Sequence, residues 1–237
     1  MAERPNESAA TVDFEFSALN QAHHYRAALV QEFAPALTGR VLEIGAGIGQ
    51  ITSGLLTVPG LAELVAVEPE PRFCARFREQ HPSLRLIEGT IDGLNGDHEW
   101  NAIVSINVLE HIREDEVELR RYREHLAPRR GRLCLFVPAR QEIYAPIDRD
   151  FGHFRRYARP ELRRKLEQAG FTIERLHYFN AIGYAAWWWT FCLLKNRGFN
   201  AGAVSFFDHR IFPIMWALER KVARPPFGQS LLAVARA

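Results

Sequence analysis

Three alternating glycines directly after a buried strand constrain this chain more than any other feature. Residues 40–45 form a short apolar run with β-branched residues, and Gly45, Gly47 and Gly49 stand at every second position from its end. Glycines at a strand-to-helix turn let the backbone adopt left-handed angles and approach a ligand closely. In an open α/β sheet, ligands bind at the carboxyl ends of the strands. The turn therefore predicts a small-molecule site on an α/β sheet.

The rest of the chain alternates strands and helices, as such a sheet requires. Further apolar strand patterns cover residues 64–68, 84–87, 102–106, 132–137, 171–178 and 229–235. Helical patterns lie between strands at 71–80, 114–126 and 160–169. This order predicts an α/β fold with a doubly wound, mostly parallel seven-stranded sheet. We expect one domain over residues 1–237, with 1–18 as a mobile tail.

An aromatic-rich segment separates the last two predicted strands. Residues 181–228 include Trp187, Trp188 and Trp189 and are too long for an ordinary loop. We expect a helical insertion here, before the last strand. Three roles are open for it: a cap packed on the sheet edge, the wall of an apolar pocket, or an attachment to a membrane surface.

The net charge of +2 hides an asymmetry along the chain. Residues 1–150 hold 16 Lys and Arg against 23 Asp and Glu, whereas residues 151–237 hold 14 against 5. The basic third could face an acidic acceptor or an anionic membrane surface. Arginines that coat solvent-exposed helices explain the same asymmetry equally well.

Composition and termini indicate a cytoplasmic protein without metal. The longest apolar run, residues 181–194, is shorter than the roughly 20 residues that span a bilayer, and the polar N-terminus lacks a secretory pattern. The three cysteines are far apart, at positions 74, 134 and 192, and predict neither disulfides nor a zinc cluster. Adjacent His23 and His24 point apart on a helix, so they predict no metal site either.

Two acidic residues make the glycine turn more specific. Glu43 stands two residues before Gly45, and Glu68 ends the second predicted strand, where a carboxylate accepts hydrogen bonds from both hydroxyls of a ribose. The dinucleotide pattern G-x-G-x-x-G requires glycine at position 50, which is glutamine, so a nicotinamide-dependent oxidoreductase is disfavoured. The pattern Glu-x-Gly-x-Gly-x-Gly instead resembles the first motif of class I S-adenosylmethionine-dependent methyltransferases.

Other segments share this resemblance. Residues 107–112 resemble the Leu-Glu-His-Ile motif that follows the fourth strand in small-molecule members, and residues 127–133 resemble the turn into the fifth strand. Residues 151–157 and parts of 180–234 resemble the UbiE/Coq5-like and methyltransferase 23 groups. The likeness to the common fold covers roughly residues 20–180 and the final strand.

The resemblance implies S-adenosylmethionine as cofactor. By matching positions it assigns cofactor binding to Glu43, Gly45, Gly47, Gly49, Glu68, Thr90, Ile91, Asn107 and Val108. Glu43 would orient the methionine ammonium and Glu68 would hold the ribose. Many members carry an acid where Thr90 stands, so the adenine contacts of this chain depart from the common pattern.

The acceptor side of the predicted site is less constrained. A hydroxyl acceptor usually needs a general base, and His153 is the candidate because an ordinary histidine titrates near neutral pH. A surface histidine beside two arginines is the competing interpretation. Candidate acceptor-binding residues are Tyr25, His111, Tyr144, Tyr157 and Trp187, each of which could instead be a core residue.

The predicted function is methyl transfer from S-adenosylmethionine to a small or lipid-like acceptor, on oxygen. A glycan or carbon acceptor stays open, as does a non-catalytic membrane-surface protein on a methyltransferase fold. We expect no nucleic-acid partner, because the loop after the fourth predicted strand lacks the Asn-Pro-Pro-aromatic motif of base-modifying enzymes. Location at the inner membrane surface is compatible with the aromatic insertion.

Overall fold

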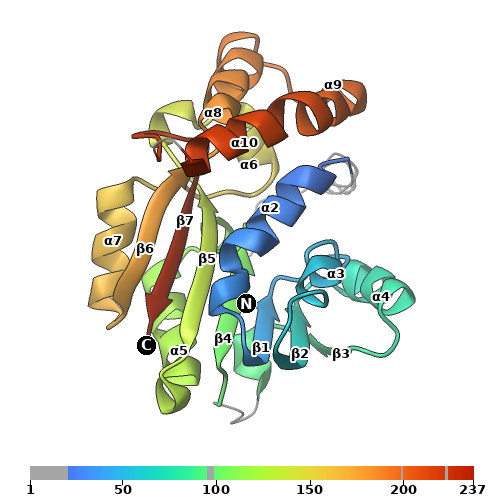
Figure 1. Ribbon diagram of the computed structural model, residues 1–237, viewed down its shortest axis with the longest axis vertical. Helices are drawn as coiled ribbons and strands as arrows, with labels where there is room; N and C mark the ends of the chain where they lie inside the picture. The colour runs from blue at the N-terminus through green and yellow to red at the C-terminus, as the bar shows by residue number, and fades with distance from the viewer. Residues whose placement is uncertain (1–20, 95–98, 199, 222–223) are drawn as a thin grey trace.

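The computed structural model describes residues 21–94, 99–198, 200–221 and 224–237. Its sheet has seven strands in the order β3-β2-β1-β4-β5-β7-β6 (Figure 1). The strands are β1 (Gly39–Ile44), β2 (Leu61–Glu68), β3 (Arg85–Glu88), β4 (Ala102–Ile106), β5 (Arg132–Pro138), β6 (Thr172–Phe179) and β7 (Ser230–Arg236). This confirms the predicted seven-stranded α/β fold. The tail predicted over residues 1–18 lies outside the described residues.

Helices pack on both faces of the sheet. They are α2 (His23–Phe33), α3 (Thr52–Leu55), α4 (Pro71–Gln80), α5 (Asp115–Leu126), α6 (Pro146–Asp150), α7 (Arg159–Gln168), α8 (Ala181–Trp187), α9 (Ala201–Phe206) and α10 (Phe212–Lys221). Successive strand residues point to opposite faces, so Leu133 and Leu135 join the core under α5 and α7. Cys134 and Phe136 join the second core, which is covered by α2, α3 and α10.

The strand order places a ligand site at one edge of the sheet. The chain forms β1, β2 and β3 outward in one direction and then returns to pair β4 with the other side of β1. The sheet order therefore reverses between β1 and β4, and ligands of open α/β sheets bind at such a switch point. β1 to β5 are parallel, whereas β7 is antiparallel to both β5 and β6.

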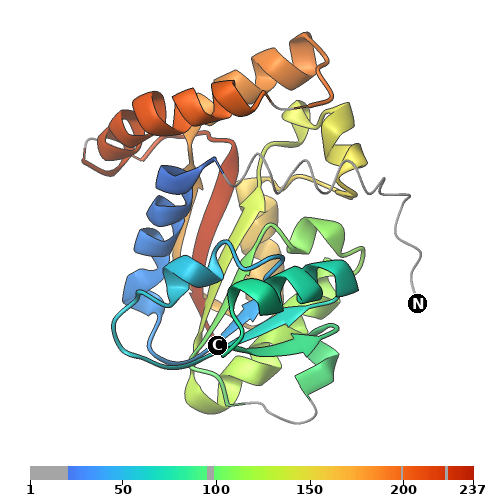
Figure 2. The same cartoon turned by 90° about the vertical axis from the view of Figure 1, so that its right-hand side faces the viewer.

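The predicted helical insertion is present between β6 and β7. It contains α8, α9 and α10, with π-helical stretches at Trp188–Leu193 and Phe207–Ile211. We call residues 181–221 the cap, because Figures 1 and 2 show it lying across the carboxyl edge of the sheet, above α2. No helix among the described residues is long and apolar enough to cross a bilayer.

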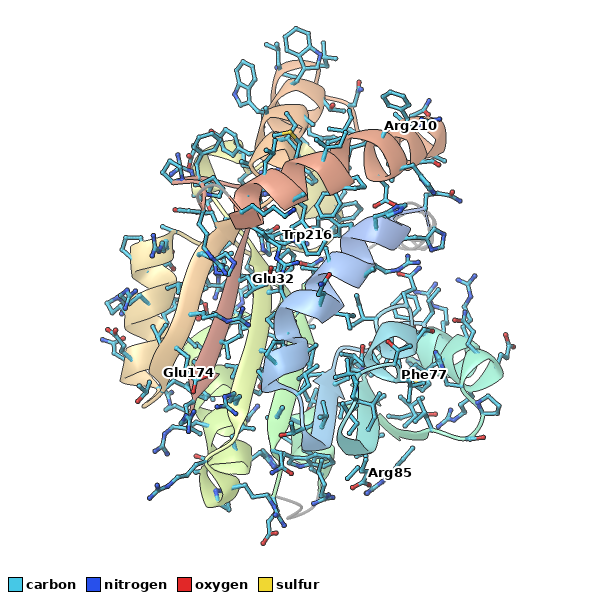
Figure 3. The ribbon with its side chains drawn as sticks, viewed as in Figure 1. Glu32, Phe77, Arg85, Glu174, Arg210 and Trp216 are labelled. Carbon is cyan, nitrogen blue, oxygen red and sulfur yellow. The ribbon has the colours of Figure 1, made fainter. Side chains whose placement is uncertain are left out.

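Hydrogen bonds and ion pairs hold the cap against the sheet and α2. Glu219 of α10 accepts hydrogen bonds from the backbone N–H groups of Asn180 (3.1 Å) and Ala181 (2.7 Å). Glu32 of α2, labelled in Figure 3, pairs with Arg175 of β6 at 3.3 Å and Arg220 of α10 at 3.4 Å. Because these contacts join α2, β6 and α10, they fix the cap over the edge where the strands end.

Candidate active site at the carboxyl edge of the sheet

A cavity of about 490 Å³ opens at the switch point between β1 and β4. Its walls come from the ends of β1, β2 and β4, from α2, and from Phe151, Gly152 and Phe154 after α6. A volume of this size is ordinary for a small-molecule site. The cavity therefore lies where the sequence places its glycine turn.

The glycine turn forms one wall of the cavity. Gly45 and Gly47 have left-handed backbone angles, with φ of +69° and +57°. A Cβ atom on Gly45 would lie 2.4 Å from Cγ2 of Val108, so this position needs glycine for both conformation and space. The carboxylate of Glu68 accepts hydrogen bonds from the backbone N–H of Gly47 (2.8 Å) and of Glu70 (2.9 Å). These bonds join the turn after β1 to the end of β2.

Glu43 places a second carboxyl group on the same wall. Its side chain is buried near the end of β1, and the hydroxyl of Thr52 donates a hydrogen bond to Oε2 at 2.6 Å. Burial, with a smaller contribution from the neighbouring Glu68, raises the pKa of Glu43 to about 8, against the opposing effect of the Thr52 hydrogen bond. A carboxyl group in this setting gains a partner when a cation enters the cavity.

Four more predicted cofactor residues, Thr90, Ile91, Asn107 and Val108, line the cavity. Asn107 directly follows β4 and has a φ of +53°, an uncommon angle for a residue other than glycine. Such strained residues cluster at functional sites. We call the wall made by these four residues, the glycine turn, Glu43 and Glu68 the glycine-loop side.

Gly49 lies outside the cavity lining. Its φ is +91°, and a Cβ atom there would lie 2.4 Å from the ring of His81, which follows α4. In the structure, this position therefore requires glycine because the turn packs tightly against the end of α4. A contact between Gly49 and a cofactor stays a prediction.

His111 forms part of the opposite wall of the cavity, and His153 lies behind it. His111, in the turn after β4, lines the cavity, and its ring packs edge-on against His153 with centroids 4.7 Å apart. The side chain of His153 is only 8% exposed and stands behind His111, outside the lining. Its Nδ1 lies 3.0 Å from Oδ1 of Asp148, and its Nε2 lies 3.9 Å from Oε1 of the buried Glu110. The ring of His111 separates His153 from the cavity, and the catalytic role of His153 stays a prediction.

A buried ion pair holds the ring of His153. Asp148 accepts hydrogen bonds from Nε of Arg156 at 2.9 Å and from the backbone N–H of Ala145 at 2.8 Å, and Nη2 of Arg156 forms an ion pair with it at 2.8 Å. Burial alone would raise the pKa of Asp148, but the hydrogen bonds from His153 and Arg156 lower it below its usual value. Burial lowers the pKa of His153 in spite of Asp148, so the ring is neutral and its Nδ1–H donates to the carboxylate. We call Glu110, His111, Asp148, His153 and Arg156 the histidine side.

Sequence reasoning missed the roles of Asp148, Arg156 and Glu110. A signal for the first two exists: Asp148 precedes His153 by five residues and Arg156 follows it by three. Both spacings fall in an irregular segment, where no fixed period says which side chains meet. Thr52, the partner of Glu43, was missed for the same reason.

Two of the five predicted acceptor residues, Tyr25 and His111, line the cavity. Tyr25 lies on α2, and its ring also contacts Phe136 of β5. Tyr157 is a core residue whose hydroxyl donates a hydrogen bond to Asp115 at 2.8 Å.

Tyr144 and Trp187 support the histidine side from behind. The hydroxyl of Tyr144 donates to the backbone carbonyl of His153 at 2.7 Å. Trp187 of the cap is buried, its indole N–H donates to a backbone carbonyl at 3.0 Å, and the guanidinium of Arg156 stacks 4.3 Å from the ring centre. These residues therefore position the wall and are not part of the cavity lining.

Comparisons with solved structures show the fold. A candidate methyltransferase solved in complex with the Haloferax volcanii Trm112 methyltransferase activator matches with a TM-score of 0.65 and 15% identity, over 100% of this chain and 99% of that one. A candidate methyltransferase from Bacillus halodurans matches with a TM-score of 0.60 and 18% identity, over 89% and 97%. An S-adenosylmethionine-dependent methyltransferase from Mesorhizobium loti matches with a TM-score of 0.58 and 17% identity, over 88% and 95%.

Sequence comparison shows the family. A search of curated protein sequences found no match. The sequence model of a family described as a methyltransferase domain matches residues 19–176, which is more than half of the chain and includes all of the residues that line the cavity. The UbiE/Coq5-like subtype stays a prediction. The chain belongs to this family of methyltransferase domains, and it is an enzyme whose expected cofactor is S-adenosylmethionine.

Proposed function

We propose that this chain transfers the methyl group of S-adenosylmethionine to an oxygen atom of a small or lipid-like acceptor. The observation that carries the proposal is the pairing of two carboxyl groups, Glu43 and Glu68, with a left-handed glycine turn at the switch point of the sheet. S-adenosylmethionine offers one ammonium group and one ribose diol, and each needs a hydrogen-bond acceptor.

The glycine-loop side fits the cofactor group by group. Glu68 is held by two backbone N–H donors and lines the cavity, so its carboxylate suits the ribose hydroxyls. Glu43 suits the methionine ammonium, which would stabilise the charged form of this buried acid. Thr90 and Ile91 would border the adenine, and Asn107 and Val108 the methionine end. Bound here, the cofactor supplies a methyl group already activated on a sulfonium.

The histidine side supports an oxygen acceptor. His111, Phe151 and Phe154 line this end of the cavity, so an apolar or aromatic acceptor would find matching walls beside an imidazole. When oxygen attacks, the carbon–sulfur bond breaks, its electron pair stays on sulfur, and the hydroxyl proton must leave the acceptor. An imidazole pair next to the cavity is the kind of group that assists this proton loss.

The outer face of the cap supports a lipid-like acceptor. Large apolar side chains are exposed there, including Trp188 (45%), Trp189 (57%), Phe206 (62%) and Ile214 (63%). Arg210, labelled in Figure 3, lies in the π-helical stretch that directly follows Phe206. An apolar face with basic residues suits the interface of an anionic membrane. This contact would bring the cavity close to a lipid acceptor.

Vesicle flotation tests the membrane contact. We expect the protein to float with anionic vesicles and the Trp189→Ala variant to float several-fold less. Leu56, which is 48% exposed but follows α3 outside the cap, provides the control variant Leu56→Ala. Equal flotation of all three proteins would contradict a role for the cap.

Calorimetric titration tests the proposed cofactor, and NAD serves as the control ligand. We expect micromolar binding of S-adenosylmethionine and none of NAD. Candidate hydroxyl acceptors are then screened by release of S-adenosylhomocysteine. Binding of NAD without S-adenosylmethionine would overturn the proposal. A product methylated on carbon would overturn the oxygen assignment and keep the cofactor.

A further inference from the structure

A cluster of potential metal ligands lies on the histidine side. Glu110, His111 and His153 each offer one ligand atom, and these three atoms lie within 4.8 Å of one another. The first two belong to the turn after β4, whereas His153 follows α6. The folded chain thus assembles two imidazoles and one carboxylate beside the cavity, although the sequence pattern predicted no metal site.

The second nitrogen of His153 is the most informative atom of this cluster. Its side chain is only 8% exposed, and within the described residues Nε2 has no hydrogen-bond partner. The N–H group at Nδ1 donates a hydrogen bond to Asp148, so Nε2 carries no hydrogen and presents a lone pair. That lone pair faces the carboxyl group of Glu110 at 3.9 Å. A cation between the two groups would satisfy the buried nitrogen and bind the carboxylate as well.

The other nitrogen of His153 has the environment typical of a metal-binding imidazole. Metal-bound histidines generally donate their second N–H to a carboxylate, which fixes the tautomer and the ring orientation. Asp148 plays this part here and is itself held by Arg156 and by a backbone N–H. The proposed binding of the cofactor makes no use of this buried chain of contacts, which ends at Nε2.

We propose that Glu110, His111 and His153 bind a divalent transition-metal ion, with an open coordination position toward the cavity. Two imidazoles and a carboxylate form a donor set used for catalytic Zn²⁺ and for other ions of this class. Metal–ligand bonds are about 2.1 Å long, so ligand atoms around one ion are at most about 4.2 Å apart. The three ligand atoms now lie within 4.8 Å of one another, and small rotations of the side chains bring them within about 4.2 Å.

The open position gives the metal a use in the reaction. His111 lines the cavity, so an acceptor hydroxyl could bind the ion from there. With the imidazoles bound to it, the ion would take their place in assisting proton loss: it would lower the pKa of that hydroxyl, whose proton would pass to water before its oxygen takes the methyl group. This use rests on the proposed function, whereas metal binding itself does not.

Cobalt titration tests the site directly. Untagged protein is stripped with EDTA, dialysed and titrated with Co²⁺, which is followed by visible absorption and by calorimetry. We expect one Co²⁺ per chain with a visible absorption band. Glu110→Gln and His153→Gln should weaken binding at least 100-fold, and Asp148→Asn by roughly 10- to 100-fold, as is typical of groups that orient a ligand.

A second His/Asp group supplies the control. His24, Asp208 and His209 also offer three nearby ligand atoms, but they lie where α2 meets the cap. His209→Ala should leave Co²⁺ binding unchanged. Absence of stoichiometric binding by the native protein, or a loss in His209→Ala with retention in Glu110→Gln, would overturn the proposal.

S-adenosylhomocysteine titration of the same samples separates the two proposals. Retained binding in Glu110→Gln and His153→Gln shows that these variants are folded. If native protein binds S-adenosylhomocysteine but no Co²⁺, the metal site is overturned and the proposed function stands. If it binds Co²⁺ but neither S-adenosylhomocysteine nor S-adenosylmethionine, the metal site stands and the proposed function is overturned.

Discussion

The two walls of the cavity are built in different ways. On the glycine-loop side, backbone groups hold the main carboxylate: the N–H groups of Gly47 and Glu70 bond to Glu68, and the hydroxyl of Thr52 bonds to Glu43. On the histidine side, Asp148 and Arg156 form a buried side-chain network, and Trp187 of the cap packs on it.

This difference implies that the walls serve different purposes. The glycine-loop side presents its polar groups to a ligand, so its loss should mainly reduce cofactor affinity. On the histidine side, Asp148 and Arg156 bond to each other and Arg156 packs on the cap, so the loss of these contacts should mainly reduce the free energy of unfolding. Substitutions on each wall test this division.

Glu68→Ala should have the largest effect on binding. The substitution removes two hydrogen bonds that position the glycine turn, and the proposed ribose contacts are lost with them. Hydrogen bonds to charged groups contribute about 1.5–3 kcal/mol each, so we expect a loss of about 4 kcal/mol, or roughly 1000-fold in the dissociation constant of S-adenosylhomocysteine. Calorimetry measures it.

Glu63 provides the matched control for Glu68. It lies on the same strand, but its side chain is 38% exposed and pairs with Arg40 at 2.6 Å. Glu63→Ala should bind S-adenosylhomocysteine as the native protein does. Comparable losses in both variants would mean that damage to β2, and not the carboxylate, reduces affinity.

Trp187→Ala tests the histidine side and should mainly reduce stability. The ring is buried, stacks on Arg156 and donates a hydrogen bond through its indole N–H. Truncation of a buried tryptophan costs about 3 kcal/mol in the free energy of unfolding. Trp189→Ala, at a position 57% exposed, should cost less than about 0.5 kcal/mol. Denaturant titration measures both variants.

The division would fail if Trp187→Ala removed cofactor binding from protein that is still folded. We expect its affinity for S-adenosylhomocysteine to stay within about threefold of the native value, because the ring lies behind the cavity lining.

The same division explains which parts of the molecule the sequence could predict. The strand at residues 102–106 and the helix at residues 71–80 have the predicted bounds. Gly45, Gly47 and Glu68 also line the cavity, although Gly49 does not. Their signals are local: a short apolar run, a proline at a helix start, and a glycine where φ is positive.

The histidine side was largely beyond sequence reasoning. The residues around His153 were recognised as a motif, but Asp148 and Arg156 were given no role. Whether His153 reaches the cavity depends on how residues 139–157 fold back over β4, and no periodic pattern encodes such a path. Trp187 likewise has its role only because the cap returns to that segment.

Gly45→Ala sharpens the comparison within the glycine-loop side. The variant needs a left-handed alanine and places its Cβ against Val108, so we expect a loss of about 2 kcal/mol in stability, together with weaker binding. Gly60 has a φ of +87°, and no atom lies within 4 Å of the point that a Cβ would occupy, so Gly60→Ala should cost only the conformational part, about 1 kcal/mol. Thermal unfolding measures the loss of stability in both variants, and calorimetry measures their binding; the difference between the variants gives the effect of the contact with Val108. Unchanged binding in Gly45→Ala would show that the turn tolerates displacement.

Glu43→Gln should change the pH dependence of stability. The native carboxyl group keeps its proton up to a pKa of about 8, whereas the unfolded chain releases it near 4.5. Between these values the native state binds more protons, so this group's contribution to stability is complete below about pH 4.5 and is lost as the pH rises toward 8. The difference in unfolding free energy between native protein and variant should therefore fall by about 1 kcal/mol per pH unit in this window.

A bound ligand should alter that slope if Glu43 receives the methionine ammonium. The ammonium stabilises the ionised carboxylate, so saturating S-adenosylhomocysteine should lower the pKa of Glu43 and flatten the difference between native protein and Glu43→Gln. Denaturant titrations at several pH values, with and without ligand, measure this effect. A slope that the ligand leaves unchanged would separate Glu43 from the ammonium, and the glycine-loop side would then hold the cofactor through Glu68 and the backbone of the turn.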